Sequence, residues 1–131
     1  LSSAFQFEML APLTSRLKIA QSWLNTSATH SPIEVAAHLG NGISAHESCI
    51  TALYIALRFC DQEFSQMQHF ISQLHGDVDT IGAMSGAIWG ACNGIAAISH
   101  SLILTLEQHE RILMLAKQLQ SSAQIGLPDS T

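Results

Sequence analysis

The stretch that decides the fold reads HGDVDTIGAMSGAIWGACNGIAAI and spans residues 75–98. Glycine recurs in it at every fourth position, at Gly82, Gly86, Gly90 and Gly94. On a helix this spacing makes one continuous stripe without side chains. Each glycine costs about 1 kcal/mol relative to alanine in a helix interior, so tertiary packing has to offset the cost. The repeat therefore predicts a helix from Thr80 to about Ala97 whose glycine stripe faces another helix.

The same helix raises the question of a membrane span. Residues 81–98 carry no charge, which makes the segment a borderline transmembrane candidate by length. Against a span, Ser85 and Asn93 are polar, two aspartates stand just before the segment, and no Lys or Arg cluster flanks it. These features favour a helix buried within protein over the membrane alternative.

Outward from this stretch, apolar residues recur at helical spacing and no segment alternates with a period of two. The expected helices cover residues 4–24, with a break at Pro12, then 31–40, 46–60, 63–74 and 105–120. Capping boxes are expected at Ser31 with Glu34 and at Ser44 with Glu47, and Asp61 is a further candidate cap. The pattern predicts an all-α fold, with residues 121–131 as a disordered tail.

Composition narrows the class of protein. The chain has 131 residues, of which 47% are hydrophobic and only 11% charged, whereas about a quarter of the residues of a typical soluble domain are charged. Much of this surface is therefore expected to be buried against further protein. The net charge of −5 comes without any run of Lys or Arg, which argues against a nucleic-acid surface.

The cysteines indicate the cellular compartment, and the first residues indicate whether the chain is a fragment. Cys49, Cys60 and Cys92 are odd in number and form no C-x-x-C pair, so no disulfide framework is expected. This favours a reducing, intracellular compartment such as the cytoplasm, the nucleus or the mitochondrion. The chain begins at Leu1 and shows no signal-peptide pattern, which indicates a fragment or a processed chain.

The loop that precedes the glycine-rich helix carries the strongest chemical signal. Asp77 and Asp79 are two residues apart, and a hydroxyl follows at Thr80. Hard cations such as Mg²⁺ prefer oxygen ligands of this kind, and Gly76 would permit the tight turn that converges them. Asp and Thr are also ordinary helix caps. Spacing alone leaves both interpretations, capping and metal binding, open.

Two segments resemble a known family. Residues 76–91, GDVDTIGAMSGAIWGA, resemble the ADP-ribosylglycohydrolase signature, approximately GGDTDTIAAIAGAIAGAYYG. Residues 39–48, LGNGISAHES, look like the LGNGIAAFES segment of the branch of that family that acts on ADP-ribosyl-serine. The two motifs stand in the expected order and, with their surroundings, cover about Ile33 to Gly94.

The resemblance implies a compact orthogonal helical bundle of which residues 1–131 form the C-terminal portion. It also implies a cleft with two Mg²⁺ ions. By position in the motif, Asp77, Asp79 and Thr80 would be metal ligands, with Asp79 bridging both ions. Asn41, Gly42 and Ile43 would form a wall of the substrate site, with Ile43 contacting ADP-ribose.

The implied activity is hydrolysis at the anomeric carbon of ADP-ribose on modified proteins, with the serine linkage preferred. No residue here matches the family's catalytic carboxylate, and no T-D-D-T-like segment occurs. The chain is therefore expected to supply half of an active site, to be inactive alone, and to need the N-terminal half as its partner. The alternative is a helical structural or interaction module that has lost activity. This sequence departs from the pattern at His46, His75, Val78, Cys92 and Asn93.

Overall fold

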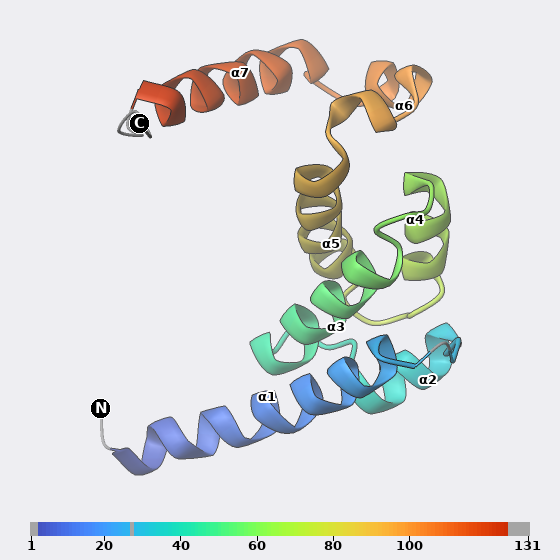
Figure 1. The fold of residues 1–131 in the computed structure, drawn as a ribbon, viewed down its shortest axis with the longest axis vertical. Helices are drawn as coiled ribbons and strands as arrows, with labels where there is room; N and C mark the ends of the chain where they lie inside the picture. The colour runs from blue at the N-terminus through green and yellow to red at the C-terminus, as the bar shows by residue number, and fades with distance from the viewer. Residues whose placement is uncertain (1–2, 27, 126–131) are drawn as a thin grey trace. The chain divides into compact units, whose positions relative to one another are not determined.

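The computed structural model describes residues 3–26 and 28–125, and these residues are helical with no strand. The expected all-α fold is therefore confirmed. The helices are α1 (Ser3–Leu24), α2 (Pro32–Leu39), α3 (Ala45–Arg58), α4 (Phe64–Ser72), α5 (Val78–Asn93), the 3-10 turn η1 (Ile95–Ala97), α6 (His100–Thr105) and α7 (His109–Ile125) (Figure 1). They fall into two compact units, residues 1–97 and residues 98–131.

Helix α3 is the centre of the first unit and packs against both α1 and α5 (Figure 1). Its side chains Tyr54 and Ile55 are buried, as is Thr51. On the side of α5, the Ser85 hydroxyl donates to the Ala52 carbonyl over 3.2 Å. From Cys49 through Ala52 to Phe59, the partners on α5 advance from Met84 through Ser85 to Trp89, so the two helices run in the same general direction.

Trp89 joins the ends of these two helices. Its indole Nε1 donates to the carbonyls of Phe59 at 3.0 Å and Gln62 at 3.2 Å, where the chain leaves α3. The ring also packs against Phe64 of α4 with a centroid separation of 5.2 Å. Trp89 is almost fully buried. Its bond to Phe59 is buried and its bond to Gln62 is partly buried, so they cost more to lose than exposed bonds.

The glycine stripe faces another helix over its first half. The buried face of α5 is formed by Ile81, Ser85 and Trp89, each one residue before a glycine. A Cβ on Gly82 or Gly86 would meet α4 side chains at ordinary van der Waals distances, 3.6 Å or more, whereas in the second half of the stripe it would meet no described atom within 4 Å. The stripe therefore lies against α4 where α5 begins, as the repeat predicts, and is open toward the end of the helix.

The ends of several helices also differ from expectation. Pro12 lies inside an unbroken α1, so the expected break there is wrong; a proline removes only one backbone hydrogen bond from a helix. Helix α5 ends at Asn93 rather than near Ala97, since Gly94 adopts a φ of 73°. In the second unit a left-handed Gln108 separates α6 from α7, and α7 continues to Ile125. The rest of the expected tail, residues 126–131, lies outside the described residues.

The expected caps are partly correct. Ser31 and Glu34 form the predicted capping box, with the Ser31 N–H donating to Glu34 Oε2 over 2.8 Å. Ser44 makes no side-chain capping bond, so the second box is wrong. Asp61 does not begin α4, which starts at Phe64 with the Glu63 N–H donating to a Gln66 side chain. No helix of the described chain is long and apolar enough to cross a membrane.

The double hydrogen bond of Trp89 predicts a large effect of its removal. Trp89→Phe should lower the free energy of unfolding by about 2–3 kcal/mol, because it deprives two carbonyls of a donor and removes buried volume. Urea unfolding followed by circular dichroism measures the change. Trp23→Phe is the matched control, since Trp23 is half-buried and stacks on His30, and should cost about 1 kcal/mol. Equal losses at both positions would contradict the assignment.

Candidate functional site

Two loops that are distant in the sequence meet at the start of α5. One loop joins α2 to α3 and contains Asn41, and the other joins α4 to α5 and contains Asp77. The Asn41 Nδ2 donates to the Leu74 carbonyl over 2.9 Å. The Asn41 carbonyl accepts from the Asp77 N–H over 2.8 Å. The predicted substrate wall and the predicted metal loop are therefore in direct contact.

The contact between the loops requires glycine. Gly76 has a φ of 71°, and a Cβ at this position would collide with the Asn41 carbonyl oxygen. Gly40 ends α2 with a φ of 98°, and both it and Gly42 lie against the Glu47 side chain, which would block a Cβ there. Each glycine serves a backbone approach that any larger residue would prevent.

His75 is the strained residue of the site. It has a φ of 57°, directly before the left-handed Gly76. In this left-handed region of φ, the Cβ of a non-glycine residue comes too close to the following carbonyl oxygen, which raises the energy of the folded chain. The family pattern has glycine at this position, so the departure noted in the sequence has a conformational consequence.

Arg16, Glu47 and Thr51 support the substrate loop from behind. Thr51 is buried, and its hydroxyl donates to the Gly40 carbonyl over 2.6 Å. Arg16 of α1 lies 3.5 Å from the Glu47 carboxylate and donates to the His46 carbonyl over 3.1 Å. Sequence reasoning missed this support. It assigned Glu47 to a helix cap, whereas the carboxylate turns toward Gly42 and Arg16.

The three predicted metal ligands lie at the N-terminus of α5. Asp77 is the N-cap residue but makes no side-chain capping bond, so the capping interpretation fails for its carboxylate. Asp79 and Thr80 follow in the first turn and are exposed. Two carboxylates and a hydroxyl match the oxygen preference of Mg²⁺. Within the part of the chain that the structure describes, no cluster of three or more His, Cys, Asp or Glu residues could hold a metal.

Among the described residues, Ile43 is the most exposed large apolar side chain, with 86% of its surface accessible. It lies in the same short loop as Asn41, whose backbone is bonded to that of Asp77. An isolated exposed isoleucine is common on protein surfaces. Here its loop is bonded through Asn41 to the start of α5, so Ile43 lies two residues from that contact.

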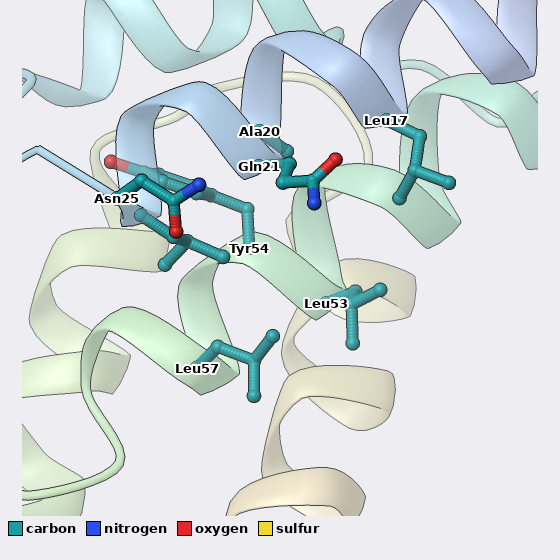
Figure 2. Close-up of a pocket in the computed structure, with 8 residues that line it drawn as sticks. Leu17, Ala20, Gln21, Asn25, Leu53, Tyr54 and Leu57 are labelled. Atoms are coloured by element: carbon teal, nitrogen blue, oxygen red, sulfur yellow. The ribbon is translucent and has the colours of Figure 1, made fainter.

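An apolar pocket lies apart from these residues, between α1 and α3 (Figure 2). Its volume is about 340 Å³. Figure 2 shows Leu17, Ala20, Gln21 and Asn25 on one side and Leu53, Tyr54 and Leu57 on the other. None of the predicted site residues lines it, and its walls hold no carboxylate or basic group. It is a surface for apolar contact rather than for chemistry.

Comparison with known proteins gives the same family from a sequence model and from individual relatives. The sequence model of the ADP-ribosylglycohydrolase family matches residues 2–126. The chain is 36% identical over 126 residues to the bovine (Bos taurus) ADP-ribosylhydrolase ARH3, covering 88% of this chain and 34% of that protein. It is 37% identical over 117 residues to the human (Homo sapiens) ADP-ribosylhydrolase ARH3, covering 82% and 32%. The chain therefore spans about a third of the length of these relatives.

The strain at His75 can be measured. His75→Gly should raise the free energy of unfolding by about 1 kcal/mol, because glycine adopts a positive φ without steric cost. Urea unfolding of the 131-residue chain measures the gain. His75→Ala is the control and should give no gain, since alanine keeps the Cβ that causes the strain. A destabilised His75→Gly chain would show that the imidazole makes a favourable contact that outweighs the strain.

Proposed function

Because the chain belongs to the ADP-ribosylglycohydrolase family, we propose that it forms part of an enzyme that hydrolyses ADP-ribose from ADP-ribosylated proteins. The observation that carries the proposal is the pair of hydrogen bonds from Asn41 to the segment that contains Leu74 and Asp77. They hold the two family motifs, which are more than thirty residues apart, as one surface. A surface of this kind can bind one ligand through both motifs.

Asp77, Asp79 and Thr80 would hold two Mg²⁺ ions. Bound Mg²⁺ would supply positive charge that orients the ribose hydroxyls and a water at the anomeric carbon. The chain itself places the ligands. The Asp77 carboxylate is free of a capping bond, and the Asn41 carbonyl accepts from the Asp77 backbone N–H. Asp79 lies in the first turn of α5, where the helix dipole stabilises its negative charge.

The substrate wall is formed by Asn41, Gly42 and Ile43. Gly42 leaves room for the Glu47 carboxylate behind the loop, which keeps the outer side of the loop free for ligand. Ile43 presents an exposed apolar side chain from the same loop as Asn41. We assign it contact with an apolar part of the ADP-ribose, because burying its side chain against a ligand would be favourable.

The remaining ligands and the catalytic carboxylate belong, in this proposal, to protein outside the chain. The chain spans only about a third of its relatives, and Mg²⁺ held by these three donors would complete its near-octahedral shell with waters and further ligands. The pocket between α1 and α3, with Leu17, Leu24 and Leu57 exposed around it, is a surface on which that further protein would pack. The chain alone would then be inactive.

The preferred linkage is the O-glycosidic bond to serine. The segment of residues 39–48 supports this preference, since its LGNGI sequence resembles the branch that acts on ADP-ribosyl-serine. The cysteine usage supports an intracellular compartment, in the cytoplasm, the nucleus or the mitochondrion. The acidic net charge of −5 supports a protein substrate rather than a nucleic-acid partner.

A chimera tests the proposed function. In it, this chain replaces the matching segment of the bovine relative, and release of ADP-ribose from an ADP-ribosyl-serine peptide is measured with Mg²⁺. Asp79→Asn should lower the rate by about 100-fold or more, because it removes a charge at the reacting centre. Asp61→Asn, an exposed aspartate in the turn after α3, is the matched control and should leave the rate unchanged. The 131-residue chain alone should release nothing.

The outcomes of these measurements distinguish an enzyme from a structural or interaction module. A folded chimera that binds neither Mg²⁺ nor ADP-ribose would overturn the enzyme proposal and favour a structural or interaction module. Activity of the 131-residue chain by itself would overturn the half-site proposal and leave the family activity standing.

The exposed isoleucine gives a second test in the same chimera. Ile43→Asn should weaken ADP-ribose binding about 10-fold, equivalent to about 1.4 kcal/mol, because it removes an apolar contact while leaving the backbone of the loop free to fold. Isothermal titration with ADP-ribose and Mg²⁺ measures the change. Ile33→Asn is the control, because Ile33 is 73% exposed on α2 and should not affect binding. Equal weakening at both positions would remove Ile43 from the substrate wall.

A further inference from the structure

A side chain of α1 reaches the loop that carries the proposed substrate wall. Arg16 makes three contacts with the segment that leads into α3. Its Nη2 lies 3.5 Å from Oε1 of Glu47, and its Nη1 donates to the His46 carbonyl over 3.1 Å. The same Nη1 would lie 3.1 Å from a Cβ on Gly40. The guanidinium therefore touches both the beginning and the end of residues 40–47.

Glu47 stands between Arg16 and the loop. Its Cβ and Cγ pack against Gly40, and its carboxylate packs against Gly42. The side chains of the ion pair are only 23% and 29% exposed, so a carboxylate left there without its cation would be unfavourable. Without Arg16 we therefore expect the Glu47 carboxylate to turn toward water and to leave Gly42 without its packing.

The other bonds of the loop act on its first two residues. The Thr51 hydroxyl donates to the Gly40 carbonyl over 2.6 Å, and Asn41 bonds the segment before α5. Among the described residues, none forms a hydrogen bond with Gly42 or Ile43. The packing of Glu47 against Gly42 is thus the contact that restrains the outer part of the loop.

We infer that Arg16 is a positioning residue, which through Glu47 holds Gly42 and Ile43 in the arrangement that binds ADP-ribose. The inference rests on the proposed function of this loop. Arg16 bonds Glu47 and His46 rather than the acidic loop, so its effect is on affinity and not on the chemical step. A loop that keeps its binding arrangement about a tenth of the time raises the apparent Kd about 10-fold.

Backbone order in the 131-residue chain tests the contact without any ligand. The amides of Gly42 and Ile43 are followed by NMR relaxation, with the amide of the buried Ile55 in α3 as the reference. Arg16→Met should lower the order parameters of both loop amides from about 0.85 to below about 0.6 and leave the reference unchanged. Lys18→Met is the matched control, because it removes a positive charge from an exposed position of the same helix, and should change none of them.

The chimera with the bovine relative tests the consequence for the ligand. Arg16→Met should raise both the Kd for ADP-ribose and the KM about 10-fold and change kcat less than about 2-fold, because it removes binding that ground state and transition state share. Arg16→Lys should recover part of the affinity, since an ammonium restores the charge beside Glu47 but lacks the fork that also reaches His46. Glu47→Gln should weaken binding to a similar extent, and the double variant Arg16→Met with Glu47→Gln should be no weaker than either single one.

The two arms distinguish this inference from the proposed function. If the chimera without substitutions neither binds nor hydrolyses, the proposed function fails, and the ligand named here fails with it even where the order parameters show that Arg16 restrains the loop. If that chimera is active, three results overturn the inference alone. These are unchanged order parameters in Arg16→Met, a loosened loop with unchanged affinity, and a fall in kcat with unchanged KM.

Discussion

The rest of the structure depends on the contact that Asn41 makes with the segment before α5. Its side chain bonds the Leu74 carbonyl and its own carbonyl bonds the Asp77 N–H. The approach is so close that Gly76 has no room for a Cβ. Through this contact a loop that would otherwise be free on the surface becomes part of the start of α5. A residue whose side chain and backbone carbonyl each satisfy a backbone group of the same distant segment restricts two loops at once.

The parallel packing of α3 and α5 extends that constraint along the unit. Ser85 bonds Ala52 near the middle and Trp89 bonds Phe59 near the end, so both helices are fixed at several depths. The site lies at the end of this pair where α5 begins.

The family explains why the acidic loop and the Asn41 loop are both present, and the structure adds how they are held. Thr51 fixes the Gly40 carbonyl from inside α3, and Arg16 of α1 reaches the Glu47 carboxylate. Helix α1 matters to the site for this reason, although no motif lies in it. The strained His75 shows the opposite case, a position where this chain departs from the family pattern and accepts an unfavourable φ.

The sequence by itself determined the helical class, the capping box at Ser31, the glycine turns and the identity of the two motifs, because these depend on local spacing and backbone preference. It was wrong on Pro12, which lies inside an unbroken α1, and right on only the first half of the glycine stripe, because the helix that covers a given face is set by neighbours that are distant in the chain. Only the tertiary structure decided that Asn41 meets Asp77 and that Glu47 turns toward Arg16. Each of these contacts joins residues about thirty or more positions apart, and no local pattern encodes which distant partner a side chain will reach.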